Sequence, residues 1–101
     1  MVRETLRRML GETPYIHTLL FFYENREYIG NLSGLSERLG LSHVTVRKVV
    51  RDLLSLGVLE VLDVGRSKVV RLNKSSPHTQ TLFEFFDKIR TLEGSEGARM
   101  S

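Results

Sequence analysis

The chain has 101 residues, 41% of them hydrophobic, which is enough for one small globular domain. It holds no cysteine, which excludes disulfides and cysteine-bound metals, and no apolar run approaches the ~20 residues that span a bilayer. Residues 32–72 hold seven basic and four acidic side chains and account for the whole net charge of +3, because the segments on either side each balance. Such a local basic excess is typical of a surface that faces a polyphosphate.

The first third of the chain predicts two helices. Apolar residues recur at helical spacing within residues 1–12 and predict a short helix that Gly11 ends. Thr13 and Pro14 then form a helix start signal, with threonine as the N-cap and proline in the first turn, where its missing N–H costs nothing. The broad apolar face that follows predicts a helix that continues to about Tyr28.

Two short helices joined by a tight turn are predicted next. Ser33 is expected to cap a helix over residues 34–39, and Ser42 to cap a helix over residues 43–56. Gly40 between them suits the left-handed backbone of a sharp turn. The apolar residues expected to face inward are Leu35, Leu39, Leu41, Val46, Val49, Val50 and Leu53.

A hairpin and a last helix complete the pattern. Two β-rich runs at 58–62 and 68–72 flank a turn that contains Gly65, which predicts a hairpin. A second start signal, Ser76 with Pro77, opens a helix that Gly94 is expected to end, with a flexible tail over residues 94–101. The fold class predicted is mainly α with one small β-hairpin.

Residues 42–47, Ser-His-Val-Thr-Val-Arg, are similar to the Ser-Arg-x-Thr-Val-Arg opening of recognition helices in GntR-type prokaryotic transcription regulators, with His43 in place of the usual arginine. Leu53, Gly57, Val58 and Glu60 continue that pattern into the hairpin. The resemblance covers about residues 14–73 and implies a winged helix-turn-helix, a three-helix core plus a wing, over residues 13–73. The helix at 74–93 is expected to serve dimerisation, and the N-terminal helix at 1–12 is an addition to the core.

The resemblance implies that the second helix enters the major groove of double-stranded DNA. Arg47 is then placed to donate to guanine O6 and N7, while Val44 and Thr45 meet a thymine methyl group. Lys48 and Arg51 are better placed for phosphates, and the wing at 63–68 for the minor groove. The residues expected to contact DNA are Ser42, His43, Val44, Thr45, Arg47, Lys48, Arg51, Arg66 and Lys68. The alternatives are that the charges are only solvated, and that Val44 is a packing residue.

The last helix carries more apolar surface than one domain needs to bury. One side is expected to cover the chain's own domain and the other to meet a second copy, since buried aromatic side chains offset the cost of association. The residues assigned to dimerisation are Leu82, Phe83, Phe85, Phe86, Ile89 and Leu92. The alternative is that this helix only completes a monomeric core.

No local motif for catalysis, phosphate binding or metal binding is present in the sequence, so we expect no enzyme activity, no cofactor and no small-molecule ligand. The function expected is that of a small, cytoplasmic, nucleoid-associated homodimer that regulates transcription by recognising an inverted repeat in double-stranded DNA. Two alternatives remain: a winged-helix module that binds another protein, and a plasmid or viral protein for replication or copy control. No membrane partner is expected.

Overall fold

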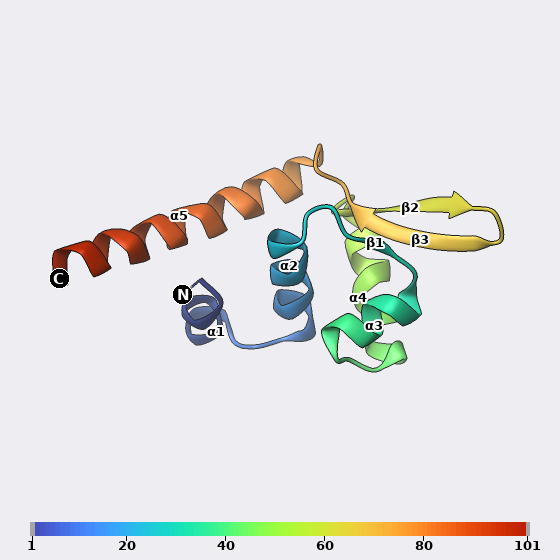
Figure 1. Ribbon diagram of the computed structural model, residues 1–101, viewed down its shortest axis with the longest axis horizontal. Helices are drawn as coiled ribbons and strands as arrows, with labels where there is room; N and C mark the ends of the chain where they lie inside the picture. The colour runs from blue at the N-terminus through green and yellow to red at the C-terminus, as the bar shows by residue number, and fades with distance from the viewer. Residues whose placement is uncertain (1, 101) are drawn as a thin grey trace.

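A computed structural model describes the backbone of residues 2–100 and the side chains of residues 2–94. Figure 1 shows a central body of α2, α3 and α4, with a β-hairpin extending from one end and α5 from the other. The elements in chain order are α1 (Val2–Leu10), α2 (Pro14–Glu24), β1 (Ile29–Gly30), α3 (Leu32–Leu39), α4 (His43–Ser55), β2 (Leu59–Val64), β3 (Ser67–Leu72) and α5 (Pro77–Met100). The predicted fold class, mainly α with a small hairpin, is confirmed.

The sheet is antiparallel, with the strand order β1-β3-β2. Because Val64 pairs with Ser67, the hairpin turn consists of Gly65 and Arg66 alone. Gly65 has a φ of 63°, and Arg66 has no positive φ, because no residue other than glycine has one in the described chain. A positive φ at the first central position only is that of a type II′ turn. The strands therefore extend further toward the tip than the runs 58–62 and 68–72 predicted.

Helix α2 ends earlier than the sequence predicts, at Glu24 and not near Tyr28. Asn25 ends it by donating twice to the carbonyl of Phe21, from its backbone N–H at 2.8 Å and from its side-chain amide at 2.9 Å. The backbone then leaves the helical path and pairs with β3 as the short strand β1, which the sequence did not predict. This strand fixes where α3 begins.

The turn between α3 and α4 has the predicted left-handed glycine, since Gly40 has a φ of 68°. The backbone N–H groups of Gly40 and Leu41 both donate to the carbonyl of Ser36, at 2.9 and 3.2 Å. The buried Ser36 hydroxyl in return donates to the Leu41 carbonyl. The Ser36 side chain thus satisfies a backbone carbonyl of the turn.

The helix caps agree with the sequence at α4 and differ at α3. Ser42 caps α4 as predicted, with its hydroxyl oxygen 3.2 Å from the N–H of Thr45. The cap of α3 is Asn31 and not Ser33, because the Asn31 side chain accepts from the N–H of Gly34 at 2.8 Å. The asparagine oxygen reaches the third N–H of the helix from the extended backbone of residue 31, which places the helix start two residues earlier than predicted.

All five helices contribute to one core. Its fully buried large side chains include Leu6 of α1, Phe22 of α2, Leu35 of α3 and Val46 of α4. Helix α5 adds Phe83 and Phe86, whose rings meet that of Tyr23 edge-on, with centroids 5.2 and 5.1 Å apart. One side of α5 therefore covers the domain of its own chain, as predicted.

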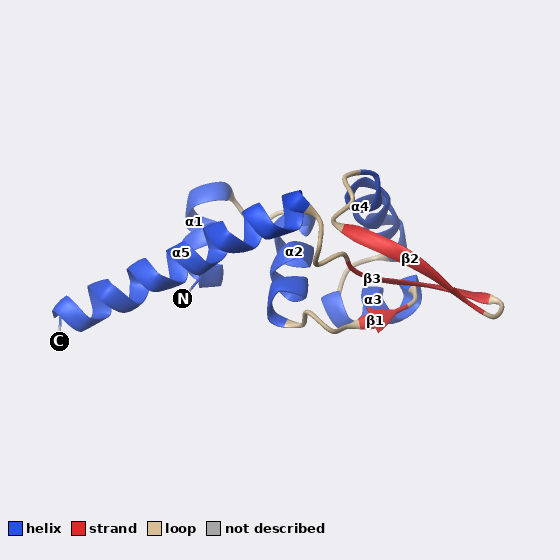
Figure 2. Ribbon diagram, turned by 90° about the horizontal axis from the view of Figure 1, so that it is seen from above, coloured by secondary structure: helices blue, strands red, loops and turns tan. Residues whose placement is uncertain are grey.

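Helix α5 passes through Gly94 and continues to Met100, so the prediction that Gly94 ends it is wrong. Gly94 lacks the positive φ of a helix-ending glycine, and a glycine inside a helix costs only about 1 kcal/mol relative to alanine. In Figures 1 and 2 the C-terminal end of α5 runs past α1 and away from the three-helix body. A flexible tail over residues 94–101 stays a prediction.

Candidate nucleic-acid interface

Helix α4 buries one stripe of side chains and exposes the opposite one. The buried stripe consists of Val46, Val49, Val50 and Leu53. Val44, Lys48 and Arg51 follow one another at spacings of four and three residues, which places them on the far side of the helix, and all three are exposed. Val44 has 74% of its surface exposed, which excludes its role as a packing residue within this chain.

The first turn of α4 is held by two hydroxyl groups. The Ser42 hydroxyl accepts from the backbone N–H of Thr45 and donates to the Thr45 hydroxyl oxygen, 2.9 Å away. The proton of the Thr45 hydroxyl remains available to an acceptor outside the protein. The backbone N–H groups that start the helix lie beside it, so this end of α4 presents donors and the positive end of the helix dipole.

Five exposed cations of α4 and of the outer part of the hairpin form no side-chain ion pair and no side-chain hydrogen bond within the described residues. These cations are Arg47, Lys48, Arg51, Arg66 and Lys68. Elsewhere in the described chain, Arg3, Arg7, Arg71, Lys74 and Arg90 each pair with a carboxylate. These five cations of α4 and the outer hairpin can therefore meet an anion without first breaking an ion pair or a hydrogen bond.

The one acidic residue of α4, Asp52, is held by a neighbouring helix. The Tyr15 hydroxyl of α2 donates a hydrogen bond to the Asp52 carboxylate. This hydrogen bond raises the pKa of Tyr15 above its usual value, and burial of the hydroxyl contributes less to the same increase. Tyr15 was not among the predicted site residues, because a contact across 37 positions leaves no local signal in the sequence. Its effect is to keep the only carboxylate of the helix engaged with α2.

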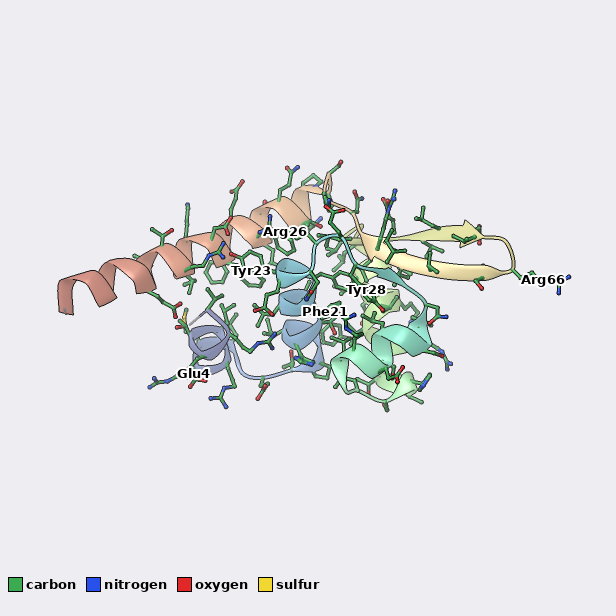
Figure 3. All side chains as sticks on the ribbon, viewed as in Figure 1. Glu4, Phe21, Tyr23, Arg26, Tyr28 and Arg66 are labelled. Atoms are coloured by element: carbon green, nitrogen blue, oxygen red, sulfur yellow. The ribbon has the colours of Figure 1, made fainter. Side chains whose placement is uncertain are left out.

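The β2–β3 hairpin carries Arg66 at its tip. Figure 3 shows the Arg66 side chain extending beyond the turn, away from the helical body. Lys68 is exposed near the start of β3, and Val64 before the turn has 60% of its surface exposed. The hairpin thus projects a short basic arm from the same end of the molecule as α3 and α4 (Figure 1).

The six residues assigned to dimerisation divide into two groups. Phe83, Phe86 and Ile89 are buried in the core of their own chain, so they offer no separate surface. Leu82 is partly buried against that core, while Phe85 and Leu92 have 36% and 57% of their surfaces exposed. Any contact with a second copy through α5 therefore rests on these last three.

A hollow of about 860 Å³ lies open between α1, α2 and α5. Apolar side chains of Val2, Leu20 and Tyr23 line it, with arginines and glutamates around them. Among the described residues, no three His, Asp or Glu side chains are grouped so as to hold a metal ion. None of the helices in that part of the chain is both long enough and apolar enough to cross a membrane.

No protein-family model matches the sequence, and no curated protein matches it significantly. Solved structures do match. MepR, a transcription regulator of the multidrug efflux pump MepA of Staphylococcus aureus, is 20% identical with a TM-score of 0.62, over 94% of this chain and 72% of that chain.

A MepR variant bound to an oligodeoxyribonucleotide is 18% identical with a TM-score of 0.64, over 98% of this chain and 78% of that one. Sso10a-2, a DNA-binding protein from Sulfolobus solfataricus, is 18% identical with a TM-score of 0.58, over 88% of this chain and 93% of that one. These likenesses show that the chain has the winged-helix fold of these regulators, in which α3 and α4 form the helix-turn-helix and β2–β3 the wing.

Proposed function

We propose that this protein regulates transcription as a homodimer that binds double-stranded DNA sequence-selectively. The observation that carries the proposal is the outward face of α4, which presents exposed cations without internal partners while its single carboxylate is bonded to Tyr15. Such a face suits the major groove of DNA, which is wide enough for a helix. Acceptor atoms of the bases and the flanking phosphates can bind the cations there. The wing and the start of α4 supply further donors.

In this proposal the residues of α4 have separate tasks. Arg47 donates to guanine O6 and N7, a contact worth ~1–3 kcal/mol of discrimination. Lys48 and Arg51 bind phosphates and supply affinity that does not depend on sequence. The similarity of residues 42–47 to GntR-type recognition helices supports the placement of Ser42, His43 and Thr45 at the groove wall.

The wing has a task of its own. Arg66 at the tip of the two-residue turn reaches the adjacent minor groove, where the backbone phosphates and base acceptors attract a guanidinium group. Lys68 lies at the foot of the same turn and binds the flanking phosphate. The exposure of both side chains and the absence of internal partners for them in the described residues support this role.

Dimerisation is proposed along α5. This helix extends past the body of its own chain and leaves Phe85 and Leu92 exposed. The neighbouring hollow has arginines and glutamates at its edge, a mixture that suits the same surface of a second copy related by twofold symmetry. A twofold pair places two α4 helices in successive major grooves about 34 Å apart and so requires an inverted repeat.

A fluorescence-anisotropy titration with mixed-sequence duplexes tests DNA binding, and selection from random duplexes then tests sequence preference. We expect binding at low salt and a selected site with twofold symmetry. For a dimer that contacts ~6–10 phosphates, affinity falls by ~10³–10⁵ between 50 and 200 mM salt. Failure to bind any duplex at 50 mM salt would exclude the proposal.

The exposed Phe85 and Leu92 also favour a second candidate, a winged-helix module whose α5 binds a different protein. The same titration separates the two functions. A module of this kind does not bind duplex DNA at low ionic strength, whereas the proposed regulator binds it in the absence of any partner protein.

A further inference from the structure

We propose that Val44 is a specificity-determining residue that recognises the 5-methyl group of a thymine in the major groove. This inference rests on the proposed DNA-binding function and names one base that the protein reads. It starts from the position of Val44, which lies in the first turn of α4 with 74% of its surface exposed. Among the large hydrophobic side chains of the described residues, it is the most exposed.

The position of Val44 makes it more than a stray apolar residue on the surface. It lies on the face of α4 opposite the buried Val46 and Val49. A ligand that binds the exposed face of α4 therefore contacts Val44. A valine in a helix keeps essentially one side-chain rotamer, so its two methyl groups are held in place before any ligand arrives. An aliphatic group at that place gains by contact with an apolar group of the ligand and not with a phosphate.

Thymine is the one standard base that offers such a group, because its 5-methyl lies in the major groove. The side chains beside Val44 narrow the choice further. Arg47 and Lys48 follow it by three and four residues, are exposed, and carry only hydrogen-bond donors. Thymine has the acceptor O4 next to its methyl group, whereas 5-methylcytosine has the N4 amino donor there. The surroundings of Val44 therefore suit thymine and disfavour 5-methylcytosine.

The one carboxylate of α4 that could accept from the amino group of cytosine is already hydrogen-bonded within the protein. A carboxylate is the usual acceptor for the cytosine amino group, and the only carboxylate of α4 belongs to Asp52. Asp52 lies eight residues beyond Val44 along α4, and its carboxylate accepts a hydrogen bond from the Tyr15 hydroxyl of α2. The exposed side of α4 around Val44 thus combines one methyl contact with the donors of Arg47 and Lys48, and its one carboxylate is bonded to α2.

The test uses the duplex obtained by selection and replaces its thymines by deoxyuridine, one at a time in each half-site. Deoxyuridine lacks only the methyl group, so the wild-type protein is expected to bind about fourfold more weakly per half-site at one thymine position. Val44→Ala is expected to bind the thymine and deoxyuridine duplexes equally at that position. A duplex with 5-methylcytosine there, paired with guanine, is expected to bind more weakly than the thymine duplex.

Val64→Ala is the matched control, because Val64 is exposed to a similar extent but belongs to the wing. No thymine methyl lies in the minor groove, so this variant keeps the full preference for thymine over deoxyuridine. Equal melting temperatures for the wild type and both variants establish that each is folded.

The inference is overturned if the wild type is indifferent to the methyl group at every thymine, or if Val44→Ala keeps the preference. Binding to 5-methylcytosine as tight as to thymine overturns the choice of base. These results leave sequence-selective binding intact, so they refute this inference alone. A protein without any sequence preference refutes the proposed function and this inference together.

Discussion

His17 of α2 donates from its ring Nε2 to the carbonyl oxygen of Leu39, the last residue of α3, at 2.8 Å. Because a carbonyl only accepts, the proton lies on Nε2, and Nδ1 is left to accept from the guanidinium of Arg3 at 3.2 Å. Arg3 also donates to Glu24 at 2.9 Å. One histidine therefore ties α1 to the start of the turn that orients α4.

Replacing His17 by alanine removes both of these hydrogen bonds and leaves the partly buried carbonyl of Leu39 without this donor. We expect the free energy of unfolding to fall by about 1–2 kcal/mol, as measured by urea denaturation. His78→Ala is the control, because the His78 side chain is exposed on α5 and makes no hydrogen bond within the described residues. Equal unfolding free energies for the two variants would contradict a structural role for His17.

Arg47→Ala and Lys48→Ala should weaken DNA binding in different ways. Loss of a guanine contact at Arg47 is expected to reduce the ratio of specific to random-duplex affinity by about 10- to 100-fold. Loss of a phosphate contact at Lys48 should weaken both affinities alike and lower the salt slope by about one. Anisotropy titrations at several salt concentrations measure both effects. If Arg47→Ala weakens binding to both duplexes equally, the residue does not read bases.

Arg66→Ala tests the wing. The variant removes the cation at the tip of the hairpin, so we expect weaker DNA binding and a salt slope lower by about one. Arg8→Ala removes a cation of α1 that is also exposed and should leave both quantities unchanged. Matching losses in the two variants would mean that the effect comes from net charge and not from contact by the wing.

The hydrogen bond between Tyr23 and Asp87 predicts a pH-dependent contribution to stability. The Tyr23 hydroxyl, 2.5 Å from the carboxylate, together with Arg90, lowers the pKa of Asp87 below its ordinary value of 3.8. A carboxyl group with a lower pKa in the folded state stabilises the fold above that ordinary value, and this stabilisation is lost as the pH falls through the folded-state pKa.

Tyr23→Phe keeps the ring in the core and removes the bond. We expect it to lower the free energy of unfolding by about 0.5–1 kcal/mol at pH 6, a modest loss because the Asp87 side chain is half exposed. The difference from wild type should shrink as the pH falls below 3.8. Tyr28→Phe, whose hydroxyl has no hydrogen bond within the described residues, is the control. A difference that stays constant down to pH 2 would rule out the linkage.

Leu92→Glu tests the proposed dimer. Leu92 has 57% of its surface exposed in the single chain, so a charge there costs little in the monomer but much in an interface. Light scattering should give twice 11.6 kDa for the wild type and 11.6 kDa for the variant. Val61→Glu on the exposed face of β2 should remain a dimer. A wild-type protein that is monomeric at micromolar concentration contradicts dimerisation itself.

Local signals in the sequence were sufficient for most helix starts and for the central turn. Thr13, Ser42 and Ser76 cap the helices that were predicted to follow them, and Gly40 has the left-handed backbone expected of it. Each of these features depends on residues within four positions of one another, so the sequence pattern contains all the information. The winged-helix fold followed from them together with the hairpin.

The features that the sequence did not predict depend on distant contacts. Strand β1 exists because Ile29 meets Arg71 of β3, and the residue types at positions 29 and 30 carry no sign of that pairing. Likewise, the sequence predicted an apolar α5 but not that Phe83 would pack inward while Phe85 stayed at the surface. The tie between Tyr15 and Asp52 has the same origin, so the sequence identified the cations of α4 but not what restrains its carboxylate.

The length of α5 has a consequence for assembly. A helix of 24 residues measures about 36 Å, close to one full turn of the DNA double helix. In a pair of chains joined side by side along α5, the length of this helix sets the distance between the two DNA-binding domains. An engineered insertion or deletion of one helical turn in α5 would then alter the spacer length that the protein prefers, without changing any residue that touches DNA.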